Sequence, residues 1–239
     1  MKTTFGDVPL WGRIEPGKPL LFVIRGAFPV RDHLMNLVAD LPNLSVGLVH
    51  LPGMHSPFFE VPSVATFARA FDEIVDQFAG PTAVLGSSLG GAVAMAMKSR
   101  HIQRRILLDT PLQTAGLWQV VRSVRPALEG RPHLATWVDA LLGITPEAVI
   151  NRDYRGLING DETVVVAEEP LGEPRTIVRL IPSAVSEADR STYRAAGCRV
   201  IEAPETGHEI TADAMALVLE VIRGVTESMP ITRGRAANV

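Results

Sequence analysis

The stretch that decides the fold is residues 81–99, Pro-Thr-Ala-Val-Leu-Gly-Ser-Ser-Leu-Gly-Gly-Ala-Val-Ala-Met-Ala-Met-Lys-Ser. It joins a short apolar run at 82–85 to an Ala/Met-rich segment at 89–97, a pattern that predicts a buried strand, a tight turn and a helix. Glycines lie two residues before and two residues after Ser88, where they remove Cβ atoms that would clash in such a turn. We therefore expect Ser88 to project as a nucleophile, with the amide of Leu89 facing an oxyanion.

Along the rest of the chain, short apolar runs alternate with segments of helical periodicity. This alternation predicts βαβ crossovers and a mostly parallel sheet flanked by helices, so the expected fold class is α/β. Strands are expected at 20–24, 44–49, 82–85, 104–108, 176–181 and 199–201, and helices at 32–39, 64–78, 89–97, 186–196 and 211–222. Residues 4–15 suit a short edge hairpin, whereas the β-branched residues 163–167 fit either a strand or the end of an inserted segment.

The turn at Ser88 resembles the nucleophile elbow of the α/β-hydrolase superfamily. Gly207-His208, after the last predicted strand, is similar to the turn that carries the catalytic histidine in that family. The resemblance implies that Ser88 is the nucleophile and His208 the general base. It also implies one domain over residues 1–239, with a short helical cap inserted at 112–161 and a flexible tail at 229–239.

The turn after the first buried strand departs from the family pattern. Arg25 stands where the family usually has histidine, whereas Gly26 is kept. The resemblance places the second oxyanion-hole amide at Ala27. We expect Arg25 to pair with an acidic neighbour such as Asp32, the alternative being that it binds a substrate carboxylate.

The triad acid is the residue that the resemblance leaves open. Val185 falls where relatives often have an aspartate, so the usual position holds no carboxylate. Asp109 follows the predicted strand at 104–108, a place from which some members of the superfamily supply the acid, and we favour it. The alternatives are Glu187 or Asp189 at the start of the next helix, and then Glu168, Glu169 or no acid.

Composition and charge exclude several classes of function. The net charge is −3 and the 23 Lys and Arg are scattered, so neither nucleic acid nor an anionic membrane is an expected partner. The single cysteine, Cys198, excludes an internal disulfide and is expected at the buried start of a strand. The six histidines show no metal-ligand spacing, so neither metal nor cofactor is expected, and a loop histidine such as His50 is expected to be structural or solvated. Without a signal-peptide pattern or an apolar run near ~18 residues, a cytoplasmic protein is expected.

Together these residues favour a serine hydrolase that cleaves an ester or thioester of a small, largely apolar acyl group. Three alternatives remain: a C–C bond hydrolase or lyase that uses the same site, a non-catalytic ligand-binding protein on a hydrolase fold, and a cofactor-free peroxidase. Apolar side chains of the predicted cap either line a pocket for a small-molecule substrate or pack the cap onto the body. They are Leu117, Trp118, Trp137, Leu141 and Leu142.

Overall fold

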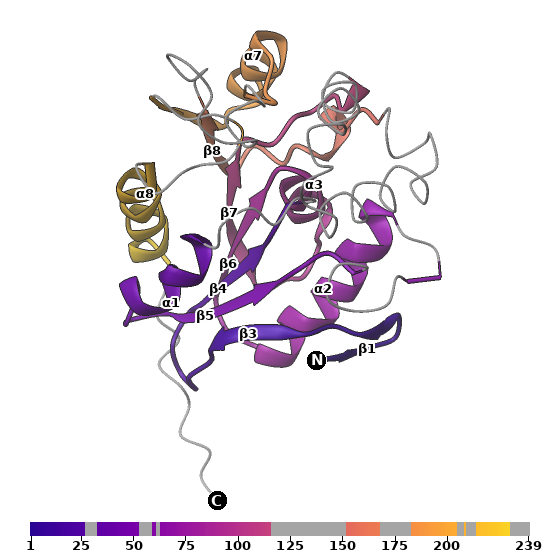
Figure 1. Ribbon diagram of the computed structural model, residues 1–239, viewed down its shortest axis with the longest axis vertical. Helices are drawn as coiled ribbons and strands as arrows, with labels where there is room; N and C mark the ends of the chain where they lie inside the picture. Colours follow the sequence, from indigo (N-terminus) through magenta and orange to yellow (C-terminus); the bar gives the residue numbers. More distant parts are fainter. Residues whose placement is uncertain are drawn as a thin grey trace, which may run out of the picture.

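A seven-stranded sheet in the order β3-β5-β4-β6-β7-β8-β9 forms the centre of the protein (Figure 1). The computed structural model describes residues 1–26, 33–52, 59–60, 63–115, 152–167, 183–204, 208 and 214–229. The strands are β3 (Leu10–Arg13), β4 (Leu20–Ile24), β5 (Ser45–Val49), β6 (Thr82–Ser87), β7 (Ile102–Leu108), β8 (Glu162–Ala167) and β9 (Arg199–Ala203). β3 pairs antiparallel with β5, and the other neighbours in this sheet pair parallel. The predicted α/β fold is confirmed.

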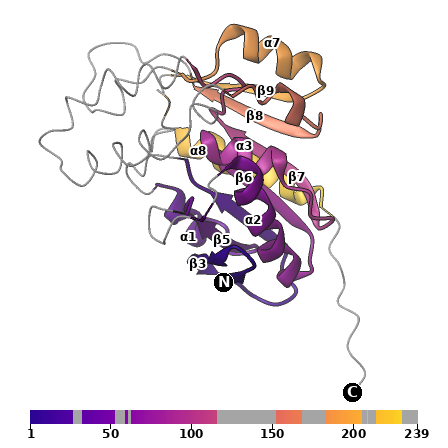
Figure 2. The same cartoon turned by 90° about the vertical axis from the view of Figure 1, so that its right-hand side faces the viewer.

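Helices cover both faces of the sheet (Figure 2). On one face, α2 (Val64–Phe78) and α3 (Leu89–Ala96) share a hydrophobic core with the strands, and Tyr193 of α7 (Glu187–Ala195) joins it. On the other face, α1 (Leu37–Asp40) and α8 (Met215–Glu227) form a second core. The short elements are β1 (Lys2–Thr3), β2 (Gly6–Asp7), η1 (His33–Asn36) and η3 (Arg155–Leu157).

The burial of β4 explains why the sequence shows a continuous apolar run rather than an alternation. All five residues of β4 are buried. Leu20, Phe22 and Ile24 belong to the core on the α2 and α3 face, whereas Leu21 and Val23 belong to the core on the α1 and α8 face. A parallel strand between two helical layers must be apolar on both sides, so the run itself is the signal of a central strand.

The long helix α2 begins and ends as its sequence predicts. The side chain of Ser63 accepts a hydrogen bond from the Thr66 amide at 3.0 Å, which caps the first turn. Phe67, Phe71 and Ile74 lie buried against the sheet, as their helical spacing predicts. The helix ends at Ala79, which adopts the left-handed conformation with φ 50°.

One open strand assignment is resolved by the structure, and one strand prediction needs correction. Residues 163–167, which the sequence alone does not assign, belong to β8, which lies between β7 and β9. The predicted strand at 176–181 lies outside the described residues. The expected hairpin at 4–15 is instead a small β1-β2 hairpin followed by the separate edge strand β3. The prediction was wrong there because local alternation does not show that β3 pairs with β5, more than 30 residues away.

The two ends of the predicted cap insertion lie side by side. The amide of Tyr154 donates to the carbonyl of Leu112 at 2.7 Å, and that of Thr114 donates to the carbonyl of Arg152 at 3.2 Å. Most of the predicted cap, residues 116–151, and the tail at 230–239 lie outside the described residues, so the domain boundaries stay predictions. In the described part of the chain, no helix is long and apolar enough to cross a membrane.

Candidate active site

Ser88 occupies the tight turn between β6 and α3 that its motif predicts. Its backbone has φ 52° and ψ −122°, a conformation that residues other than glycine rarely adopt. A Cβ atom on Gly86 would lie 2.4 Å from the carbonyl oxygen of Gly90, and one on Gly90 would lie 2.5 Å from that of Ile24. Both motif glycines are therefore required, because α3 approaches the strands too closely for any side chain there.

Ser88 is hydrogen-bonded to His208, which in turn contacts Asp109. Oγ of Ser88 lies 2.9 Å from Nε2 of His208, and Nδ1 of His208 lies 2.7 Å from Oδ2 of Asp109. All three side chains are buried, and Asp109 is 0% exposed. With its proton on Nδ1, a neutral His208 donates to Asp109 and accepts from the Ser88 hydroxyl at Nε2. The structure thus places in one chain of contacts three residues that are 21 or more positions apart in sequence.

The Asp109 carboxylate lies in a cradle of hydrogen-bond donors. Oδ1 accepts from the amide of Ala167 at 3.0 Å and from the hydroxyl of Ser183 at 2.6 Å. Oδ2 accepts from the amide of Ala184 at 2.8 Å, in addition to its contact with His208. A buried carboxylate without such donors would carry a large desolvation cost. The cradle therefore allows a charged group to lie fully inside the protein.

Backbone strain is concentrated at the same place. Among the described residues, three that are not glycine have positive φ: Ala79, Ser88 and Asp109. Ala79 ends α2, where a left-handed residue is ordinary. The other two, with φ 52° and 41°, point their side chains at the same imidazole. Strained residues persist only where the surroundings over-determine them, which is typical of functional sites.

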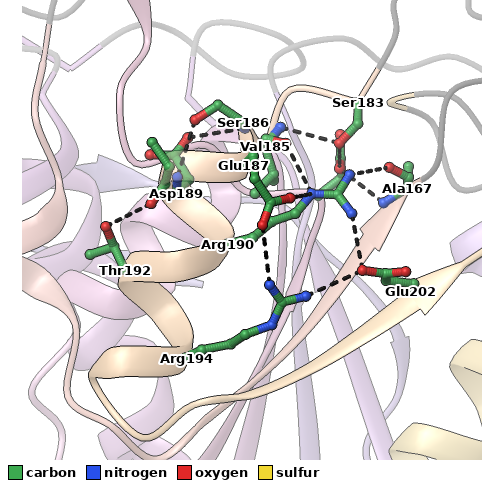
Figure 3. A network of polar contacts seen from close by, with 12 residues as sticks. Ala167, Ser183, Val185, Ser186, Glu187, Asp189, Arg190, Thr192, Arg194 and Glu202 are labelled. Atoms are coloured by element: carbon green, nitrogen blue, oxygen red, sulfur yellow. Dashed lines mark hydrogen bonds and ion pairs between the residues drawn. The ribbon is translucent and has the colours of Figure 1, made fainter.

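The alternative acids, Glu187 and Asp189, have other contacts in the first turn of α7 (Figure 3). Asp189 forms a capping box with Ser186, in which each side chain contacts the backbone amide of the other. Burial raises the pKa of Asp189 above its ordinary value, and hydrogen bonds with Ser186 oppose that shift. The side chain of Glu187 is 76% exposed and pairs with Arg190 and Arg194. Glu168 and Glu169 lie outside the described residues.

The turn after β4 lies directly against Ser88. A Cβ atom on Gly26 would lie 3.0 Å from Cβ of Ser88, so this turn leaves little room for a side chain at position 26. Arg25 is buried, and its Nη1 lies 3.4 Å from Nε2 of His50. Both Ala27, the predicted second oxyanion donor, and Asp32, the expected partner of Arg25, lie outside the described residues.

His50 is a buried residue rather than a solvated one. It is 8% exposed and meets the ring of Trp11 edge-on, with centroids 4.8 Å apart. Of the two interpretations that the sequence allows for a loop histidine, the structure therefore supports the structural one. Leu89, the predicted first oxyanion donor, is the first residue of α3, immediately after Ser88.

Ser183 is a site residue that the sequence reasoning missed. The resemblance to α/β-hydrolases draws attention to Val185, which is buried and apolar, and to the acidic residues that follow it. The hydroxyl of Ser183 nevertheless contacts Asp109 across 74 positions of sequence. A serine in a loop carries no local signal for such a contact, so it becomes visible only once β7 and the loop before α7 are placed together.

In the part of the chain that the structure describes, no group of histidine, cysteine and carboxylate side chains is arranged to hold a metal ion. Cys198 is buried one residue before β9, as predicted. Burial, together with the neighbouring Glu162 carboxylate, raises the pKa of its thiol to about 12, so the thiol stays protonated at neutral pH.

Comparisons with known proteins show the same fold. An N-formylmaleamic acid deformylase from Pseudomonas putida matches with a TM-score of 0.63 and 16% identity, over 89% of this chain and 94% of that one. An enol-lactonase from Burkholderia xenovorans matches with a TM-score of 0.62 and 18% identity, over 92% and 96%. An α/β-hydrolase enzyme from a Medee basin deep-sea metagenome library matches with a TM-score of 0.68 and 10% identity, over 94% of both chains.

At these identities, similarity to solved structures shows the fold alone. No curated protein matches the sequence. A sequence model of the α/β-hydrolase family, however, matches residues 22–221, which is well over half of the chain. That span includes Ser88, Asp109 and His208, and with the fold it shows that the chain belongs to the α/β-hydrolase family.

Proposed function

We propose that the protein is a serine hydrolase that cleaves an ester or thioester of a small, largely apolar acyl group through an acyl-enzyme. The observation that carries the proposal is the buried chain of contacts from Ser88 through His208 to Asp109. Membership of a family of hydrolases supports the reaction class. The preference for an apolar acyl group rests on the aromatic and leucine side chains in the sequence of the predicted cap.

In the first half of the reaction, Nε2 of His208 takes the proton of the Ser88 hydroxyl as Oγ attacks the carbonyl carbon. The imidazolium formed in this step is stabilised by the Asp109 carboxylate at Nδ1. The carbonyl oxygen becomes an oxyanion that accepts hydrogen bonds from the amides of Leu89 and Ala27. When the tetrahedral intermediate collapses, the bond to the alcohol or thiol breaks and His208 gives the leaving group its proton.

In the second half, water repeats the sequence on the acyl-enzyme. His208 takes a proton from water, the resulting hydroxide attacks the acyl carbon, and the bond to Ser88 Oγ breaks. His208 then returns the proton to Ser88, and the carboxylic acid leaves. Each proton transfer uses the contacts around one imidazole, which alternates between base and acid.

The proposal is tested with a fluorophosphonate probe and short p-nitrophenyl esters. We expect the probe to label the folded protein on Ser88 and the parent to hydrolyse the esters, because the serine is hydrogen-bonded to a base. Ser88→Ala should lower turnover by about 10³-fold or more and abolish labelling. Ser87→Ala is the matched control, since Ser87 ends β6 and precedes the turn residue, and it should retain both properties.

Three results would contradict the proposal. One is a folded parent protein that the probe does not label, which favours a non-catalytic binding protein. Another is ester turnover that persists in Ser88→Ala. The third is an equal loss in Ser87→Ala and Ser88→Ala, which would contradict the choice between the two serines.

A further inference from the structure

We infer that Ser183 is a positioning residue for the proposed reaction: its hydroxyl orients the Asp109 carboxylate, and thereby the imidazole of His208. The inference rests on the proposed function. Ser183 belongs to the loop just before α7, and it does not touch the reacting atoms. It acts through Asp109, whose Oδ1 lies 2.6 Å from the Ser183 hydroxyl.

The carboxylate of Asp109 has two contacts on each oxygen. Oδ2 carries the contact with His208 and accepts from the Ala184 amide, while Oδ1 accepts from the Ala167 amide and from Ser183. Because the group is 0% exposed, the carboxylate depends on these protein donors rather than on contact with solvent. Four contacts in fixed directions hold the plane of the carboxylate, and that plane sets the direction in which Oδ2 meets Nδ1 of His208.

The hydroxyl of Ser183 is itself oriented. It accepts a hydrogen bond from the amide of Val185 at 3.2 Å. That contact occupies one lone pair and directs the hydroxyl proton toward Asp109. The hydroxyl is therefore a fixed donor to the carboxylate, unlike a serine that rotates freely on a surface.

A second layer holds the two backbone segments that carry the cradle amides. The guanidinium of Arg190 donates to the carbonyl of Ala167 at 3.3 Å and to that of Val185 at 3.5 Å (Figure 3). Ala167 supplies one cradle amide, and Val185 follows Ala184, which supplies another. Arg190 is in turn paired with Glu202 of β9 at 3.4 Å. The loop of Ser183 is thus fixed to the end of β8, as a positioning role requires.

The experiment compares rates of Ser88 labelling by the fluorophosphonate probe, which needs an activated serine but no matching substrate. We expect Ser183→Ala to slow labelling about tenfold, because one of two donors to Oδ1 is lost and the carboxylate turns away from Nδ1. Ser183→Thr keeps a hydroxyl and should restore the rate to within about threefold of the parent. With a substrate ester, the loss should fall on kcat and leave KM within about twofold.

A double-mutant cycle separates positioning from a general structural effect. If Ser183 acts through Asp109, adding Ser183→Ala to Asp109→Asn should cost nothing further. The matched control is Ser186→Ala, which removes a serine from the same loop and weakens the capping box of α7 without touching Asp109. It should lower the melting temperature yet label within about twofold of the parent rate.

The outcomes distinguish the inference from the proposed function. If Ser183→Ala is labelled at the parent rate, Ser183 has no positioning role. The same holds if Ser183→Ala slows labelling equally with and without Asp109→Asn. Either result leaves the proposed serine hydrolase intact. A slowing in Ser183→Ala that Ser183→Thr does not reverse also overturns the positioning role. A parent protein that is not labelled overturns the proposed function, and the positioning role with it.

Discussion

The two buried aspartates at the carboxyl end of the sheet, Asp109 and Asp189, share several features but have different partners. Their exposed fractions are 0% and 4%. Each contacts a backbone amide and a serine of the loop before α7, Ser183 for Asp109 and Ser186 for Asp189. The serine of Asp189 is its neighbour three positions earlier, whereas that of Asp109 is 74 positions away.

This difference separates a carboxylate that starts a helix from the one that we propose as the triad acid. Asp189 completes a capping box, which any helix start can use, and it also contacts the backbone of Leu112. Asp109 collects donors from the end of β8, the loop before α7 and an imidazole 99 positions away. A residue that only caps a helix needs neither donors from several distant segments nor a positive φ, and Asp109 has both.

The largest expected effect is that of Asp109→Asn. We expect kcat to fall by about 10² or more with a modest change in KM and melting temperature, because the amide cannot hold His208 in the tautomer that accepts the Ser88 proton. Asp189→Asn and Glu187→Gln are the matched controls on α7 and should stay within about tenfold of the parent. Steady-state ester kinetics on the four proteins measure this.

The contrast between Asp109 and Asp189 would be wrong if the order of the kcat losses is reversed. A loss in Asp189→Asn or Glu187→Gln larger than that in Asp109→Asn would mean that the acid comes from the first turn of α7. Asp109 would then be a buried structural carboxylate, whatever its distance to His208.

Much of the fold is legible in the sequence because the central strands are buried on both faces. The apolar runs that become β4, β5, β6 and β7 are short, continuous and separated by helical periodicity, so each was predicted close to its observed position. β8 is the exception, since its β-branched residues follow an inserted segment and no neighbouring rhythm identifies them. Its place beside β7 comes from pairing, which a local pattern does not encode.

The residues of the candidate site also fall into those that a local pattern predicts and those that depend on contacts between distant segments. Ser88 lies between two glycines of a short motif, and His208 directly follows Gly207 in the sequence, so a local pattern locates both. Asp109 was only favoured among several acids, because its selection depends on β7 lying beside β6 and β8. Ser183 was not predicted at all, since the contact that singles it out spans 74 positions. The sequence therefore predicts residues that belong to a short motif, but it does not predict contacts between segments that are far apart in the chain.

The second effect concerns the pH dependence of stability and isolates Asp189. Burial, the largest cause, raises its pKa in the folded protein above the ordinary value of 3.8. Its contribution to the free energy of unfolding is therefore fully present below the unfolded-state pKa and is lost as pH rises through the folded-state pKa. The Asp189→Asn variant does not titrate at this position, so the parent should gain stability relative to the variant as pH falls from 7 toward about 4.

Urea unfolding of both proteins at several pH values measures that difference directly, because the other carboxylates titrate alike in the two. The expected direction would be contradicted if the difference in free energy of unfolding between parent and variant stays constant with pH. It would also be contradicted if that difference shifts in favour of the variant on acidification. Either result would also weaken the comparison, since the burial of Asp189 would then be without consequence for its charge.

The smallest expected effect concerns the two arginines of α7, which share the partners Glu187 and Glu202 (Figure 3). The side chain of Arg194 is 47% exposed, and Arg194→Gln should change the free energy of unfolding by about 0.5 kcal/mol or less, as for most surface ion pairs. Arg190 is 15% exposed and also donates to the carbonyls of Ala167 and Val185 beside the Asp109 cradle. Arg190→Gln should therefore cost about 1 kcal/mol and slow probe labelling about threefold, whereas Arg194→Gln leaves labelling unchanged. If chemical denaturation and labelling give the same result for both variants, the support of Asp109 ends at Ser183 and the two amides, and the ion pairs of α7 serve the helix alone.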